Sequence, residues 1–264
     1  MLISLIILTY ERILNKPYYK LQSMATYSNP LIKEITIPTL LSPASIADLT
    51  NQLTVLEKEN VRFIVLKGSD HIFCNGLDLR WVAHNESGNY MPEMQEYGEF
   101  LKKLQTGKAI TIAIVKGKAA GGGMGVVCSC DYVIANTDSE FSLPEGLLGL
   151  IPGMIMPSLL NRLSPQQIKK MVLTGKGYTA EIAMEWGIAD DVVINENIEP
   201  TLNQVVSSMK SCKQGSVADI KQMLYTSQIN KDDLAQLGMT ILSAKLNEPD
   251  IKERLQDLAN YMED

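Results

Sequence analysis

Two glycine-bearing loops and one glutamate are the parts of this sequence best suited to chemistry. Gly121, Gly122 and Gly123 follow one apolar run and open a second, which should be a helix. Glycines at such a junction let a ligand approach the main chain, and the first N–H groups of a helix point outward at the positive end of its dipole. The loop therefore suits an anion, or an oxygen that becomes negative during a reaction. Close packing of helix on strand explains these glycines equally well.

The second glycine loop and the glutamate are the other two candidate parts of a reactive site. Residues 75–77 also follow an apolar run, and this loop offers either a further exposed N–H group or a plain turn. Glu145 stands alone among the apolar residues of 142–153. A carboxylate in such surroundings is either at the surface or kept for chemistry. Burial would raise its pKa and suit it to proton transfer near neutral pH.

Composition excludes several other classes of function. The glycines lack the G-x-G-x-x-G spacing and no Walker lysine follows them, so nucleotide binding is poorly supported. The formal net charge of −6 disfavours a general nucleic-acid binder. No Cys-x-x-Cys pair and no histidine pair at ligand spacing exists, which disfavours a metal site or a disulfide framework. Cys128 and Cys130 are best explained as small buried side chains.

The hydrophobic pattern predicts an α/β domain followed by helices. Short apolar runs predict strands at 61–66, 109–115, 132–135, 140–143 and 189–193. Helices are expected to start at Ser42-Pro43, Ser164-Pro165 and Thr179, and another to cover 93–105. Two or three helices are expected over 197–262. Strands that alternate with helices, followed by a helical tail, indicate the α/β class.

The first 23 residues are predicted to be an extension whose structure the pattern does not define. Residues 1–8 are apolar but only about half as long as a membrane span. No basic segment precedes them and no small-residue cleavage site follows, so they make a poor signal peptide. Met24 opens a second plausible start. We therefore expect no membrane association and a cytoplasmic location.

The order of these motifs resembles the enoyl-CoA hydratase/isomerase (crotonase) family. The resemblance covers about residues 30–260 and is carried by the segments 73–79, 116–123, 130–135, 141–153, 173–175 and 180–187. It implies a crotonase-like spiral of ββα units over residues 24–195. It also implies a helical trimerisation region over 196–264, and a homotrimer or a hexamer made of two trimers.

The resemblance also assigns roles to individual residues. The family's oxyanion hole falls on the backbone N–H groups of Leu77 and Gly122, which would hold a thioester oxygen and stabilise the enolate formed when the α-proton leaves. Glu145 matches one of the two glutamates that family hydratases use. The other would stand at position 125, where this chain has Gly125. Glu145 would therefore act alone or with a group from elsewhere.

The same resemblance predicts the rest of the pocket and its substrate. Candidate pocket residues are Gly121, Gly123, Gly125, Tyr90, Tyr97 and His84. For the tyrosines and the histidine, packing or a solvated loop is the simpler explanation. No metal and no resident cofactor is implied. The acyl group would be carried on the phosphopantetheine arm of CoA or of an acyl carrier protein, which would then be a partner.

Shorter stretches are similar to the hydratase-like proteins of polyketide β-branching, which dehydrate a carrier-bound 3-hydroxy-3-methylglutaryl group. These stretches are residues 103–107, Gly125 and the segment around Glu145. The segment after the first strand is shortened and residues 260–264 contain no basic side chain, which favours a carrier protein over CoA. We therefore predict a lyase that dehydrates or hydrates a 3-hydroxyacyl or 2-enoyl thioester. The alternatives are a Δ3,Δ2-enoyl-CoA isomerase and a binding or scaffold member with reduced catalysis.

Overall fold

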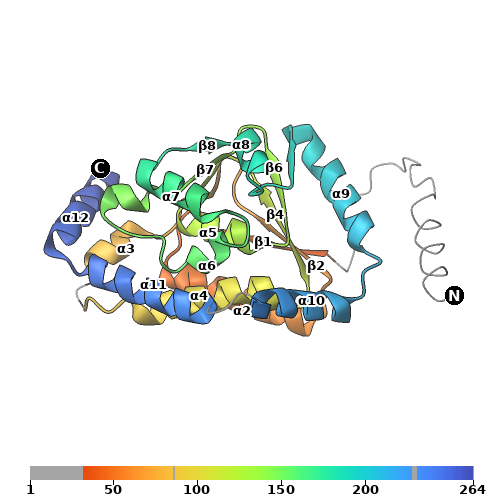
Figure 1. Cartoon of the computed structure of the whole chain (residues 1–264), viewed down its shortest axis with the longest axis horizontal. Coiled ribbons are helices and arrows are strands. Elements are labelled where there is room, and N and C mark those ends of the chain that lie inside the picture. Colours follow the sequence, from red (N-terminus) through yellow and green to blue (C-terminus); the bar gives the residue numbers. More distant parts are fainter. Residues whose placement is uncertain (1–31, 86, 228–230, 264) are drawn as a thin grey trace.

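The computed structural model describes residues 32–85, 87–227 and 231–263, so the predicted extension at 1–23 lies outside the described residues. Two β-sheets lie at the centre, and helices surround them (Figure 1). The predicted α/β class is confirmed.

Five parallel strands form the larger sheet, in the order β1-β2-β4-β6-β9. Their bounds are β1 (Ile32–Thr36), β2 (Phe63–Lys67), β4 (Ile110–Val115), β6 (Tyr132–Asn136) and β9 (Asp191–Val193). Alternate residues of β2 enter different cores: Phe63 and Val65 join one, and Ile64 and Leu66 join the other. A strand covered on both faces is apolar at nearly every position. This explains the continuous apolar runs in the sequence.

The smaller sheet has the order β3-β5-β7-β8. Its strands are β3 (Ile72–Cys74), β5 (Lys118–Ala120), β7 (Glu140–Ser142) and β8 (Tyr178–Thr179). The first three are parallel, and β8 is antiparallel to β7. The pairs β2/β3, β4/β5 and β6/β7 each give one strand to each sheet before the chain becomes helical. The predicted spiral of ββα units is therefore confirmed.

Helices cover the two faces of the larger sheet. On one side lie α2 (Pro43–Lys58), α4 (Met91–Thr106) and α5 (Gly122–Ser129), and α9 (Ile198–Met209) covers the other side (Figure 1). The remaining helices are α3 (Leu79–His84), η1 (Pro144–Leu148), α6 (Met156–Leu159), α7 (Pro165–Thr174), α8 (Ala180–Glu185), η2 (Asn195–Asn197), α10 (Gln214–Ser227), α11 (Lys231–Leu246) and α12 (Pro249–Glu263). Ser42 and Ser164 cap α2 and α7, and each is followed by proline, as predicted. None of the helices within the described ranges is both long enough and apolar enough to cross a membrane.

The C-terminal part contains four α-helices, so the expectation of two or three is wrong. The breaks are short and polar: residues 210–213 separate α9 from α10, and Asn247 and Glu248 precede the proline that opens α12. Such short connections barely interrupt a helical pattern. In the fold, α11 packs on α4 and α6, and α12 packs on α3 (Figure 1).

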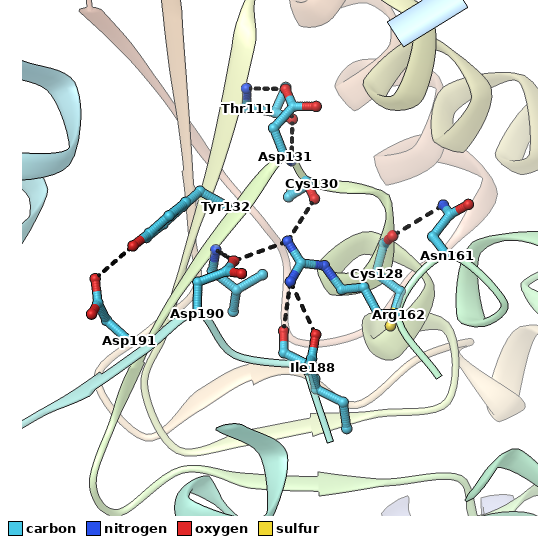
Figure 2. Close-up of polar contacts among 12 residues, drawn as sticks. Thr111, Cys128, Cys130, Asp131, Tyr132, Asn161, Arg162, Ile188, Asp190 and Asp191 are labelled. Atoms are coloured by element: carbon cyan, nitrogen blue, oxygen red, sulfur yellow. Dashed lines mark hydrogen bonds and ion pairs between the residues drawn. The ribbon is translucent and has the colours of Figure 1, made fainter. Parts of the chain in front are cut away.

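Arg162 joins the end of α5 to the segment that leads into β9 (Figure 2). Its guanidinium donates to the carbonyl oxygens of Cys130 at 3.1 Å, Gly187 at 3.2 Å and Ile188 at 3.3 Å. It also forms an ion pair with Asp190 at 3.0 Å. The Arg162 side chain is only 11% exposed, and the fork geometry of its guanidinium lets it bond to these four acceptors at once.

Replacing Arg162 with alanine should lower the free energy of unfolding by about 3 kcal/mol, because it leaves the Asp190 carboxylate and three carbonyl oxygens without this donor. Urea unfolding followed by circular dichroism measures the loss. Arg254→Ala, at an exposed position on α12, is the matched control and should change stability by less than about 0.5 kcal/mol. Equal effects of the two substitutions would contradict this role.

Candidate active site

A pocket lies at the carboxyl ends of β3, β5 and β7. Leu77 follows β3, Gly122 follows β5 and Glu145 follows β7, and all three line this pocket. Gly121 and Tyr97 line it as well. Because parallel neighbouring strands end at the same edge of a sheet, segments 45 and 23 residues apart in the chain converge here.

The two glycine loops touch each other directly. Gly76 has a φ of +88°, and a Cβ atom built on it would lie 2.8 Å from the Gly122 nitrogen and 3.1 Å from the Ala120 oxygen. A side chain at position 76 would thus be strained and would push the loops apart. Gly121 caps α5 with a φ of +50°, another conformation that favours glycine.

The N–H groups of Leu77 and Gly122 are left available by the backbone hydrogen bonds around them. The N–H group of Leu41 donates to the Gly76 oxygen at 2.8 Å, and the N–H group of Asp78 donates to the Leu41 oxygen at 2.9 Å. These two bonds flank Leu77 and do not use its N–H group. Gly122 is the first residue of α5 and therefore has no acceptor inside the helix. Within the described residues, neither group donates a hydrogen bond. An oxygen in the pocket can accept from them.

The Glu145 carboxyl group is buried at the same pocket. Its Oε2 atom has no hydrogen-bond partner among the described residues. Burial raises the pKa of Glu145 from 4.5 to about 7, opposed by a smaller effect of its own backbone N–H group. A Cβ atom on Gly121 would lie 3.4 Å from Glu145 Oε1, so the carboxyl group sits beside the start of α5. Such a group can take or give a proton near neutral pH.

Tyr97 fixes the backbone at the start of α5. It reaches across from α4, and its hydroxyl group donates to the Gly122 oxygen at 2.6 Å. Burial holds the pKa of Tyr97 well above its ordinary value, so the hydroxyl keeps its proton and remains a donor. This bond holds the peptide after Gly122 in place and so orients the glycine whose own N–H group faces the pocket.

Comparisons with known proteins show the family of this chain. A family model described as enoyl-CoA hydratase/isomerase matches residues 37–263. The chain belongs to this family. The bacillaene synthase dehydratase PksH of Bacillus subtilis (strain 168) is 31% identical over 174 residues, which cover 65% of this chain and 66% of that relative. This match therefore spans just under two thirds of PksH.

Two further similarities support the assignment. The (E)-benzylidenesuccinyl-CoA hydratase of Thauera aromatica is 30% identical over 185 residues, covering 69% of this chain and 72% of the relative. A crystal structure from Bacillus subtilis, described as a polyketide biosynthesis enoyl-CoA hydratase (PksH), has a TM-score of 0.81 at 23% identity. It covers 91% of this chain and 98% of that one, which shows a shared fold. The curated relatives are thus named hydratases and dehydratases.

At position 125, where the resemblance places a second glutamate, the space beside the backbone is filled. A Cβ atom on Gly125 would overlap the Ile155 Cγ2 atom and lie 3.2 Å from the Tyr97 hydroxyl. A glutamate side chain therefore has no room there. A glutamate at position 125 would therefore require Ile155 to move.

Several predicted pocket residues lie elsewhere. Gly123 packs on Cys74, and Gly125 packs on Ile155. Tyr90 is in the core, with its ring 5.8 Å from that of Trp81 in an edge-on contact. His84 is exposed, and its Nδ1 lies 2.7 Å from the Arg80 oxygen. None of Gly123, Gly125, Tyr90 and His84 is among the described residues that line the pocket.

Two parts of the pocket were missed from the sequence. Glu93, in the first turn of α4, lines it, and its Oε2 atom is buried with no hydrogen-bond partner among the described residues. Leu242 and Leu246 of α11 also line it, although the sequence places them in a trimerisation region. No cluster of three or more potential metal ligands occurs in the part of the chain that the structure describes.

Burial of Glu145 should reduce stability at high pH. A carboxyl group whose pKa is raised in the folded state destabilises the fold from its unfolded-state pKa upward, and the effect levels off above the folded-state pKa. Here that window runs from about pH 4.5 to about pH 7. The stability of Glu145→Gln relative to the wild type should therefore increase by about 2 kcal/mol between pH 5 and pH 8. Urea unfolding at both pH values measures this difference.

The matched control for this measurement is Glu99→Gln, an exposed glutamate on α4. Its stability relative to the wild type should change little between the two pH values. A Glu145→Gln variant whose relative stability is the same at pH 5 and pH 8 would contradict a buried carboxyl group with a raised pKa.

Proposed function

We propose that this chain is a lyase that dehydrates a 3-hydroxyacyl thioester or, in reverse, hydrates a 2-enoyl thioester. One observation carries the proposal: the buried carboxyl group of Glu145 and the unbonded N–H groups of Leu77 and Gly122 line a single pocket. Removal of an α-proton next to a thioester needs a base and donors for the developing oxyanion. The relatives named as dehydratases and hydratases support the same reaction.

The reaction uses these three groups in sequence. The thioester oxygen accepts hydrogen bonds from the N–H groups of Leu77 and Gly122. Glu145 removes the α-proton, and negative charge develops on the thioester oxygen between the two donors. The β-hydroxyl then takes a proton, either the one held by Glu145 or one from a second acid of the pocket, and leaves as water while the double bond forms. The chain supplies the base and the donors, so the only carrier group required is the phosphopantetheine arm of the substrate.

Glu145→Gln should reduce dehydration of a 3-hydroxyacyl thioester at least 100-fold, because the amide cannot accept the α-proton. Formation of the enoyl thioester is followed by its ultraviolet absorbance. In the wild type, kcat/KM should fall as the pH is lowered through about 7, because Glu145 becomes protonated. Glu99→Gln should keep the wild-type rate. Near wild-type turnover by Glu145→Gln would overturn the assignment of the base.

The acyl group is proposed to be short and branched, of the 3-hydroxy-3-methylglutaryl type, and bound to a carrier protein for polyketide biosynthesis. The cavity volume is about 120 Å³, which favours a short acyl group over a long chain. The similarity to a bacillaene synthase dehydratase supports a polyketide substrate. The shortened segment before α2 supports a carrier protein in place of CoA.

An uncharged 3-hydroxyacyl group is the second candidate substrate. Among the described residues that line the pocket there is no lysine, arginine or histidine to pair with the distal carboxylate of a glutaryl-type group. A Δ3,Δ2-enoyl thioester isomerase is the second candidate reaction, since Glu145 alone could move one proton between two carbons and position 125 holds no carboxylate. Release of water from the substrate separates the lyase from the isomerase.

The same 3-hydroxy-3-methylglutaryl group should turn over at least tenfold faster on an acyl carrier protein than on CoA. The measurement is kcat/KM for both carriers, with product detected by mass spectrometry. A carrier-bound 3-hydroxy-3-methylbutanoyl group, which lacks the distal carboxylate, tests the acyl preference. Equal rates on both carriers would contradict the carrier assignment, and a preference for the uncharged group would favour the second candidate substrate.

The proposed assembly remains a homotrimer or hexamer in the cytoplasm. Large apolar side chains exposed on α10 and α11, among them Met223, Leu224 and Leu237, support a contact between subunits on that side of the molecule.

A further inference from the structure

Dehydration needs a proton for the leaving oxygen as well as a base for the α-proton. Glu145 takes a proton from the substrate at the α-carbon. In the two-glutamate hydratases of the family, a second carboxyl group serves the oxygen, but position 125 has no space for one here. The chain must therefore supply this proton from another place, or rely on Glu145 for both steps.

The polar side chains of the pocket leave one candidate for this acid. Apart from Glu145, the described lining residues with polar side chains are Asn75, Trp81, Glu93 and Tyr97. The amide of Asn75 and the indole of Trp81 are not proton donors in acid catalysis. Tyr97 already donates its hydroxyl proton to the Gly122 oxygen at 2.6 Å. Glu93 is the carboxyl group that remains, and its buried Oε2 atom has no partner among the described residues.

The position of Glu93 on α4 relates it to the oxyanion loop through Tyr97. Residues four apart lie on the same face of a helix, so Glu93 precedes Tyr97 by one turn, about 6 Å along the axis. Tyr97 in turn contacts the Gly122 backbone at the oxyanion loop. The helix thus presents Tyr97 to the thioester end of the pocket and Glu93 one turn away, while Glu145 approaches from η1.

An unpaired carboxyl oxygen in an apolar pocket lowers stability unless a ligand supplies the missing hydrogen bond. The pocket wall around Glu93 is otherwise mostly apolar, with Met94, Ile151 and Leu246 among the lining residues. The hydroxyl group on the β-carbon of a 3-hydroxyacyl thioester is a partner of the right chemistry. It can bond to either oxygen of a carboxyl group and can receive its proton.

We propose that Glu93 is the second catalytic carboxyl group, the acid for the leaving β-hydroxyl in dehydration and the base for water in hydration. The inference rests on the proposed lyase function. Ionised Glu145 takes the α-proton, and the C–H electron pair forms the enolate. The enolate then closes the Cα–Cβ double bond as the Cβ–O bond breaks, and protonated Glu93 gives its proton to the departing oxygen. Water leaves, Glu145 ends protonated and Glu93 ionised, and solvent restores both.

Two reactions of the full-length protein separate the roles of the two carboxyl groups. The first is dehydration of a 3-hydroxyacyl thioester. The second is exchange of the α-protons of the matching saturated acyl thioester in deuterated water, which needs a base and the oxyanion donors but no leaving group. Both substrates are presented on the same carrier, and exchange is followed by mass spectrometry.

Glu93→Gln should lower kcat for dehydration by about 100-fold or more while α-proton exchange stays within about twofold of the wild type. Glu145→Gln should lose both reactions. Glu93→Asp should recover part of the dehydration rate, since it keeps a carboxyl group. Glu99→Gln, six residues further along α4 and exposed, is the control and should keep both reactions.

Wild-type dehydration by Glu93→Gln would overturn the inference while leaving the lyase intact. Loss of both reactions in Glu93→Gln would also overturn it, because Glu93 would then support the shape of the pocket and not the leaving group. Absence of dehydration in the wild-type protein, whatever its exchange, would instead overturn the proposed function on which the inference rests.

Discussion

The site depends on the close approach of two backbone segments at Gly76 and Gly122. Strands β3 and β5 are parallel neighbours, with Cys74 paired to Ala119, so their carboxyl ends must meet. A Cβ atom on Gly76 would lie 2.8 Å from the Gly122 nitrogen, and one on Gly123 would lie 2.9 Å from the Cys74 Cβ. Any side chain at these positions would separate the loops. The pairing of β3 with β5 thereby sets the distance between the N–H groups of Leu77 and Gly122. A ligand cannot easily change this distance.

The rest of the fold holds α5 at this junction from several sides. Tyr97 bonds to the first turn of the helix through the Gly122 oxygen. In its last turn, the Ser129 hydroxyl contacts the Ser158 hydroxyl of α6 at 2.9 Å. At the far end, Arg162 bonds to the Cys130 oxygen (Figure 2). Donors that are fixed before the reaction need no reorganisation when charge develops, which is the main source of their catalytic effect.

How well each strand and each site residue could be predicted from the sequence depends on how strongly burial and length shape its local pattern. Strands buried on both faces, such as β2 and β4, are continuous apolar runs and could be predicted within a few residues. Strands β3 and β5 have three residues each, too few for any period to be read. Glu145 was found because a lone carboxylate in an apolar segment is unusual. Glu93 was missed because a glutamate in the first turn of a helix is common, where it complements the helix dipole.

The distribution of charge explains why such a site can work without a cation. Before proton transfer the negative charge is on Glu145, and afterwards it is on the thioester oxygen, so the net charge of the pocket does not change. The neutral N–H donors of Leu77 and Gly122 stabilise the second state without pairing with the carboxylate in the first. A lysine or arginine in the wall would bind Glu145 as an ion pair and lower its pKa, which would make it a weaker base. The described wall contains neither, and burial instead raises the pKa of Glu145 to about 7. The apolar wall thus keeps the Glu145 carboxyl group basic. The N–H groups of the two glycine loops then stabilise the negative charge that develops on the thioester oxygen.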